Sequence, residues 1–226
     1  MITGMAGAGK TELAIRIARQ LASRYPDGLF WLGLRTYAAA ESRMGTAEAL
    51  RTLLNTLGVA PDPQATDVAG LSQKWRSVTA DRRLLLILDD VDHADQVRPL
   101  LPAAEGCAVL VTSRHALIGL DPDRAVALDP LSEDEARFLA DAILQRAGHR
   151  DPFTAAAIAA VYRLPLAVRQ ITDLKAANPS LDIAELSTTV NGGGKDEAAA
   201  ALALSVGALT PDARLLLRRI AHYPRR

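Results

Sequence analysis

Residues 4–11 run Gly-Met-Ala-Gly-Ala-Gly-Lys-Thr, and their types and spacing predict a site for phosphate groups. This order fits Gly-x-x-x-x-Gly-Lys-Thr, a P-loop whose backbone N–H groups surround an anion. In such a loop, Lys10 reaches the β- and γ-phosphates of a nucleotide, and the Thr11 hydroxyl binds Mg²⁺. Glu12 stands where a dinucleotide-binding fingerprint has its third glycine, which argues against that alternative.

Two aspartates, Asp89 and Asp90, directly follow the apolar run 84–88, which predicts a buried parallel strand. Ligands of open parallel sheets bind beyond the carboxyl ends of the strands. We therefore expect Asp89 to hold Mg²⁺ together with Thr11, and Asp90 to orient or activate the attacking water. The alternative is a solvated acidic strand end without a ligand.

Arg114 follows the apolar run 108–111 at the end of another predicted strand. A guanidinium in this position could contact the γ-phosphate and so distinguish ATP from ADP. A surface arginine in a loop is an equally good explanation from the residues alone.

The elements that must position these residues alternate between strands and helices up to residue 129. This alternation predicts an α/β domain, residues 1–129, in which helices cover both faces of a parallel sheet. The expected strands are 29–34, 84–88, 108–111 and 125–128, and the expected helices are 11–25, 46–57 and 68–79.

From Pro130 the pattern becomes helical, beginning with a capping box at 132–135. We expect a helical domain over 130–190, with helices to about 147 and at 154–162, 166–177 and 182–190. The glycine-rich segment 191–196 is predicted to be a linker, and 197–226 to be helical again.

Composition limits the possible functions. The 226 residues are 49% hydrophobic, with 26 Lys+Arg and 26 Asp+Glu, so nothing indicates nucleic-acid binding by this chain itself. The single cysteine, Cys107, excludes an internal disulfide and is expected in the core. No apolar run is long enough to span a membrane and no signal peptide is present, so a cytoplasmic protein is expected. The short segment before Gly4 suggests a fragment of a longer protein.

The four histidines are His93, His115, His149 and His222. Their spacing matches no metal site, and no segment resembles a nucleophile elbow. A solvent-facing position is expected for His93.

Five motifs occur in a characteristic order. They are the P-loop at 4–11, Leu-Leu-Ile-Leu-Asp-Asp-Val at 85–91, Val-Thr-Ser-Arg at 111–114, Leu-Asp-Pro-Leu-Ser-Glu-Asp-Glu-Ala at 128–136 and Leu-Pro-Leu-Ala at 164–167. This set resembles the NB-ARC class of STAND regulatory ATPases, in particular the ATPase module of large SARP-type actinobacterial regulators of antibiotic pathways. Residues 201–205 and 209–214 resemble the start of the family's winged-helix domain.

The resemblance implies a P-loop NTPase fold followed by a small helical domain and a truncated winged-helix domain over 197–226. It also implies catalytic roles for Lys10, Asp89 and Asp90, a Mg²⁺ site at Thr11 and Asp89, and Arg114 as γ-phosphate sensor. The implied nucleotide-binding residues are Gly4, Ala6, Gly7, Ala8, Gly9, Lys10, Thr11, Glu12, Arg114 and Pro165. Pro165 would pack near the nucleotide, although a proline that starts a helix is an equally good local explanation.

The chain departs from the family pattern in three places. Arg163 stands where the family has a glycine before Leu-Pro-Leu-Ala. The upstream segment that usually cradles the adenine is absent, and the sensor histidine of the winged-helix domain would lie beyond Arg226. Base recognition and ADP locking are therefore expected to be incomplete in this chain.

The leading hypothesis is a regulatory switch that binds ATP or ADP with Mg²⁺ between its two domains and hydrolyses ATP slowly. Its expected partners are other copies of itself or other domains of the same transcriptional regulator, with DNA contacted only through domains missing from this chain. Two alternatives remain: a P-loop kinase or metabolic ATPase, and a scaffold that binds nucleotide without hydrolysing it.

Overall fold

The computed structural model describes residues 1–34, 43–59, 67–148 and 163–177. It contains two compact units. One consists of Met1–Met5 and Gly9–Leu128, and the other of Ala6–Ala8 and Asp129–Arg226. The predicted helices 154–162 and 182–190, the predicted linker 191–196 and the predicted winged-helix start at 197–226 lie outside the described residues.

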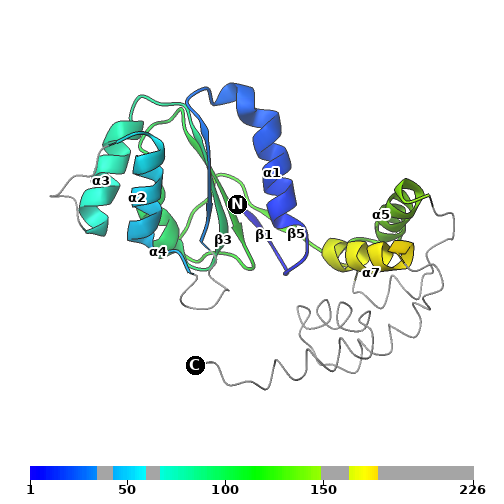
Figure 1. Cartoon of the computed structure of the whole chain (residues 1–226). Coiled ribbons are helices and arrows are strands. Elements are labelled where there is room, and N and C mark those ends of the chain that lie inside the picture. The colour runs from blue at the N-terminus through cyan, green and yellow to red at the C-terminus, as the bar shows by residue number, and fades with distance from the viewer. Residues whose placement is uncertain (35–42, 60–66, 149–162, 178–226) are drawn as a thin grey trace, which may run out of the picture. The chain divides into compact units, whose positions relative to one another are not determined.

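The first unit is built on a five-stranded sheet in which every strand pair is parallel (Figure 1). The strand order is β2-β3-β4-β1-β5. The strands are β1 (Ile2–Gly4), β2 (Leu29–Gly33), β3 (Leu85–Val91), β4 (Ala108–Ser113) and β5 (Val126–Leu128). The α/β class and the existence of the four later strands are confirmed.

Helices cover both faces of this sheet, and the interior strand β3 shows this because its successive residues point to opposite sides. On one side, Leu85 and Ile87 pack with Ala14 and Ala18 of α1 (Lys10–Leu21). On the other, alternate residues of β3 pack with α2 (Thr46–Thr56), α3 (Val68–Thr79) and α4 (Ala94–Val97). Two short 3₁₀ helices, η1 (Ala22–Arg24) and η3 (Arg98–Leu100), follow α1 and α4.

The continuous apolar run 29–34 predicts a buried strand, and this prediction was wrong for one face of β2. Phe30 and Leu32 are buried, whereas Leu29 and Trp31 are 43% and 41% exposed. The physical reason is strand order: β2 lies at one edge of the sheet, so one of its faces has little cover. An apolar run without alternation cannot distinguish a central strand from an edge strand.

Strand β3 continues three residues beyond the predicted run and includes both aspartates. The extension arises because the ladder with β2 continues to the pair Gly33 and Asp89. On its other side, the register with β4 shifts between Leu88 and Val91. Asp89 and Asp90 therefore lie in an irregular stretch of strand, not in a loop after it.

The second unit contains α5 (Glu133–Arg146) and α7 (Pro165–Ala177), which pack against each other. The predicted capping box is confirmed: the Glu135 N–H donates to Ser132 Oγ at 3.2 Å, and the Ser132 N–H donates to Glu135 Oε2 at 2.8 Å. Arg163 precedes α7 with a φ of 55°, a left-handed conformation that explains why a glycine would suit this position.

None of the helices in the described ranges has the length and apolar character that a bilayer-spanning helix requires.

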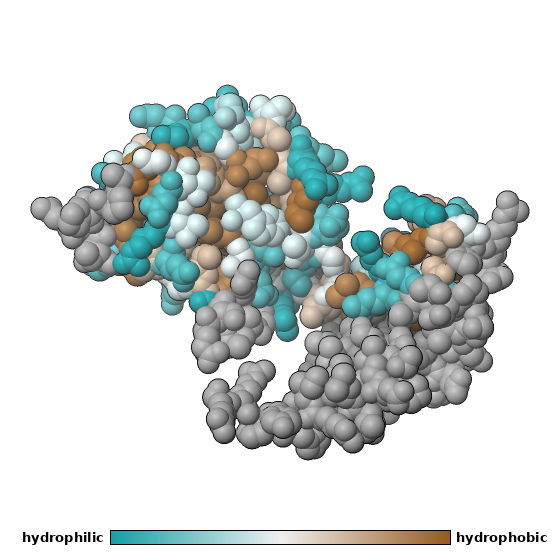
Figure 2. All heavy atoms as spheres, viewed as in Figure 1, coloured by the Kyte–Doolittle hydropathy of each residue, from teal (hydrophilic) through white to brown (hydrophobic). Residues whose placement is uncertain are grey.

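Figure 2 shows one face of the first unit, on which apolar and polar side chains are interspersed.

Candidate nucleotide-binding site

The backbone from the end of β1 to the start of α1 contains three glycines with positive φ, at positions 4, 7 and 9. Gly9 has a φ of 91° and precedes the first residue of α1, Lys10. Gly4 has a φ of 143°, and a Cβ on it would lie only 2.5 Å from the carbonyl oxygen of Leu128 in the neighbouring strand. Both positions therefore need glycine, so the motif spacing reflects backbone geometry as well as ligand chemistry.

Lys10 turns back over this loop. Its Nζ donates hydrogen bonds to the carbonyl oxygens of Gly4 and Met5, each at 2.8 Å. Partial burial lowers the pKa of Lys10, and the positive charge of Arg114 lowers it further, while Asp90 and Asp89 act in the opposite direction. The structure thus brings four predicted site residues, from the P-loop and the ends of β3 and β4, within electrostatic range of one another.

Thr11 and Asp89 meet directly, although 78 residues separate them in the sequence. The Thr11 hydroxyl donates to Asp89 Oδ1 at 2.9 Å and lies 3.2 Å from Oδ2. A hydroxyl and a carboxylate are the hard oxygen donors that Mg²⁺ prefers, and Mg²⁺ in nucleotide sites commonly uses one or two carboxylates together with phosphates. These two residues therefore fit the cation that the P-loop predicts.

Thr112 of β4 supports both aspartates, a role that sequence reasoning missed. Its hydroxyl donates to Asp89 Oδ1 at 2.5 Å and accepts from the backbone N–H of Asp90 at 3.0 Å. Thr112 is only 1% exposed. The signal available in the sequence is its place in the segment 112–114, in which Arg114 is the predicted site residue.

Asp90 has a φ of 61°, which is unusual for a residue with a side chain. This conformation coincides with the register shift between β3 and β4 and with the Thr112 hydrogen bond. Non-glycine residues in this region cost about 1–3 kcal/mol and are often found at functional sites. The observation fits a carboxylate that is held in a particular direction.

The remaining predicted site residues are placed as follows. Glu12 is exposed in the first turn of α1. Ala6, Gly7 and Ala8 belong to the second unit. Within it, the Leu166 N–H donates to the Gly7 carbonyl oxygen at 3.1 Å. Pro165 is the first residue of α7, which bears out its helix-starting explanation. Its predicted contact with nucleotide stays a prediction.

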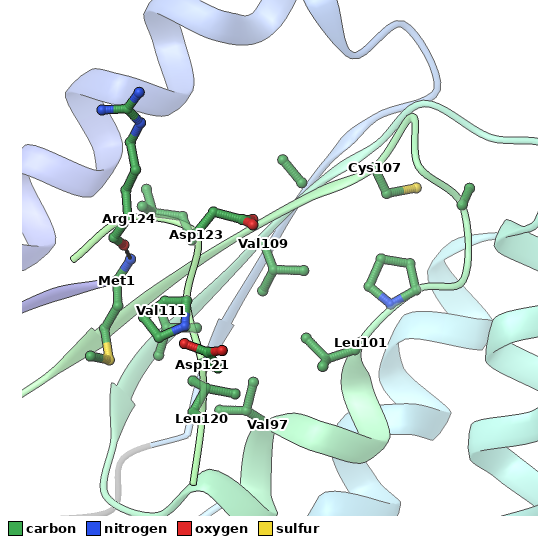
Figure 3. A pocket seen from close by; sticks show the side chains of 15 residues that line it. Met1, Val97, Leu101, Cys107, Val109, Val111, Leu120, Asp121, Asp123 and Arg124 are labelled. Carbon is green, nitrogen blue, oxygen red and sulfur yellow. Dashed lines mark hydrogen bonds between the residues drawn. The ribbon is translucent and has the colours of Figure 1, made fainter. Parts of the chain in front are cut away.

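A cavity of about 480 Å³ lies elsewhere in the first unit (Figure 3). It is bordered by β4 residues such as Val109 and Val111 and by the segment 120–124. No residue of the predicted nucleotide site lines it. In the described part of the chain, no group of three or more His, Cys, Asp or Glu side chains is arranged as a metal site.

The model of the NB-ARC domain matches residues 1–146. The chain belongs to the NB-ARC family. The match covers the P-loop, both aspartates and Arg114, which are the residues that the geometry brings together.

Among curated proteins, this NB-ARC chain is similar to regulatory proteins named AfsR. It is 34% identical over 188 residues to AfsR of Streptomyces griseus and 32% identical over 188 residues to AfsR of Streptomyces coelicolor. Each match covers 82% of this chain and 19% of the relative, so the chain spans about a fifth of the relatives' length. It is also 26% identical over 140 residues to the disease resistance-like protein DSC1 of Arabidopsis thaliana, covering 60% of this chain and 11% of that protein.

Among solved structures, the NB-ARC chain is similar to Cdc6p of Pyrobaculum aerophilum, with a TM-score of 0.47 and 16% identity over 91% of this chain and 55% of that one. The structure of Drosophila ORC bound to DNA has a TM-score of 0.46 and 17% identity over 96% of this chain and 57% of that one. The fold assignment rests on the parallel sheet and the family match.

Proposed function

We propose that this chain is a nucleotide-operated switch module that binds ATP and ADP with Mg²⁺ and hydrolyses ATP slowly. The observation that carries the proposal is the convergence of Thr11, Asp89 and Lys10 at the P-loop, with Asp90 and Arg114 within electrostatic range. Membership of the NB-ARC family supports nucleotide binding in general.

The residues divide the work of phosphate recognition. The backbone N–H groups of the P-loop and the N-terminus of α1 would bind the phosphates, since both present partial positive charge. Lys10 would exchange its two carbonyl contacts for phosphate oxygens, which compensate its charge better than neutral carbonyls do. Mg²⁺ held by Thr11 and Asp89 would neutralise charge on the β- and γ-phosphates.

Asp90 and Arg114 would make the site sensitive to the γ-phosphate. Asp90 would accept a proton from the attacking water while its backbone is held by Thr112. Arg114 would contact the γ-phosphate through its planar donors and so raise the affinity for ATP relative to ADP. A switch requires this difference in affinity between its two states, not rapid turnover.

We further propose that the module works in the cytoplasm as part of a longer transcriptional regulator of antibiotic production. The nucleotide would control domain arrangement and self-association, and DNA would be contacted only by other domains. This step is supported by the similarity to AfsR proteins, which carry the name of regulatory proteins.

Nucleotide titrations of the 226-residue chain test the proposal. Lys10→Ala should weaken MgATP binding roughly 10- to 100-fold, because a charged hydrogen bond contributes about 1.5–3 kcal/mol. Lys74→Ala is the matched control, since Lys74 lies on α3 and outside the site. Equal affinities for MgATP in all three proteins would refute the P-loop assignment, and tight binding without any hydrolysis would favour a non-hydrolysing scaffold.

A further inference from the structure

The ends of β3 and β4 are joined by an ion pair that lies outside the nucleotide-binding motifs. His115 Nε2 lies 2.8 Å from Asp92 Oδ1. Asp92 is the first residue after β3, and His115 is the second residue after β4. Because the ladder between these strands has its last pair at Val91 and Ser113, the ion pair extends the connection beyond the sheet.

Each partner is also anchored in its own segment. The Asp92 N–H donates to Gln96 Oε1 at 3.0 Å, which ties it to α4. The His115 N–H donates to the hydroxyl of Ser113 at 3.3 Å, and Ser113 is fully buried. The Asp92–His115 contact therefore connects two locally anchored segments, so a displacement of one segment is passed to the other.

The ring of His115 is about half exposed, and two acceptors beside it favour its protonated form. Nδ1 lies 3.1 Å from the carbonyl oxygen of Ala116, and Nε2 faces the Asp92 carboxylate. A neutral imidazole has one N–H, so only the protonated ring donates to both acceptors. The Ala116 carbonyl, and then Asp92, raise the pKa of His115 above its ordinary value.

The pair flanks the two residues that we assign to the γ-phosphate. Arg114 immediately precedes His115, and Asp90 lies two residues before Asp92. A displacement of either segment would change the distance between the arginine and the carboxylate. Small displacements matter here, because a misplacement of about 1 Å can cost a reaction roughly a hundredfold in rate.

We propose that Asp92 and His115 are positioning residues that hold Arg114 and Asp90 in register, so that discrimination between ATP and ADP depends on the pair. This inference rests on the proposed function. Among the described residues, His115 contacts Asp92, Ser113 and Ala116 and not the P-loop, so we assign its influence to its chain neighbour Arg114.

A second histidine beside Asp92 provides the matched control. His93 Nε2 lies 3.0 Å from Asp92 Oδ2, and its side chain is 73% exposed. Because His93 adjoins Asp92 in the same segment, its contact does not connect two strand ends. His93→Gln thus removes a histidine contact with Asp92 while leaving the link between β3 and β4 intact.

The experiment measures dissociation constants for MgATP and MgADP on the 226-residue chain by calorimetry. His115→Gln should reduce the preference for ATP relative to ADP by up to about fivefold, because a partly exposed ion pair contributes at most about 1 kcal/mol. His93→Gln should leave the ratio as in the unmodified chain. Arg114→Ala serves as the reference for full loss of γ-phosphate discrimination.

The pH dependence separates positioning from a merely structural effect. In the unmodified chain, the ion pair is complete below the raised pKa of His115 and weakens as the pH rises through it. The preference for ATP should therefore decline with rising pH, and the His115→Gln chain should lack this component. The terminal phosphate of the nucleotide titrates at about pH 6. This titration changes nucleotide binding equally in the unmodified chain and in His115→Gln.

The outcomes are distinguishable. An unchanged ratio and unchanged pH profile in His115→Gln, with normal binding by the unmodified chain, would overturn this inference alone. Failure of the unmodified chain to bind either nucleotide would refute the proposed function as well. Asp92→Asn provides an independent variant: combined with His115→Gln, it should reduce the ratio no further than His115→Gln alone, and additive losses would overturn the inference.

Discussion

Replacing Thr112 with valine tests the hydrogen-bond bridge beneath the two aspartates. Valine preserves the shape of this buried side chain but removes its hydroxyl. The change would withdraw the acceptor of the Asp90 N–H at 3.0 Å and one donor to Asp89 Oδ1. Asp90 would then lose one of the contacts that stabilise its left-handed conformation, with a φ of 61°.

The expected cost follows from these two contacts. A hydrogen bond to a charged group contributes about 1.5–3 kcal/mol, and a fully buried donor left without its acceptor costs about 1–3 kcal/mol. Both contacts of Thr112 are partly buried, so the lower parts of these ranges apply. Allowing for relaxation, we expect the free energy of unfolding to fall by about 2–4 kcal/mol. For a chain of this length, that corresponds to a decrease in melting temperature of roughly 4–16 °C.

Thr79→Val is the matched control for this prediction. Thr79 is also fully buried, but its hydroxyl donates to the Trp75 carbonyl oxygen within its own helix, at 2.8 Å. This contact lies within one helix and does not support the irregular stretch of β3. The melting temperature should therefore change much less in Thr79→Val than in Thr112→Val. Thermal unfolding followed by circular dichroism, together with Mg²⁺-dependent ATP binding, measures both effects. Equal, small shifts for the two variants with unchanged Mg²⁺ dependence would refute the reasoning.

Two further predictions concern the second unit. Arg163→Gly should raise the free energy of unfolding by about 0.5–1 kcal/mol, because glycine adopts the observed φ of 55° without a Cβ penalty; a lower melting temperature would contradict this. Glu135 accepts hydrogen bonds from the Ser132 N–H and hydroxyl, which lower its pKa. Its stabilising contribution is therefore present above the unfolded-state pKa and is lost as the pH falls through the folded-state value. The difference in melting temperature between the unmodified chain and Glu135→Gln should shrink in acid, and a difference independent of pH would exclude this origin.

The parts of the structure that could be predicted from sequence are those specified by local pattern. Residues 4–11 carry a motif whose glycines are required by the backbone itself, as Gly4 beside Leu128 illustrates. The capping box at Ser132 and the helix that starts at Pro165 depend on contacts within a few residues. Such signals survive in the sequence because their physical cause is local.

The missed features depend on strand order and register. The exposure of Trp31 follows from the place of β2 at the sheet edge, which no residue in that run encodes. The hydrogen bonds of Thr112 to Asp89 and Asp90 require a register shift between two strands far apart in the sequence. The Asp92–His115 pair likewise joins residues that become neighbours only when β3 and β4 lie side by side.

The most direct test of the account is to denature the purified chain and identify any released nucleotide by chromatography. A second sample, either refolded or left untreated, is then titrated with MgATP and MgADP. The account predicts either co-purified ADP or ATP at about one per chain, or saturable binding that depends on Mg²⁺ and is lost in Asp89→Asn. A chain that releases no nucleotide and binds neither MgATP nor MgADP while remaining folded would contradict it.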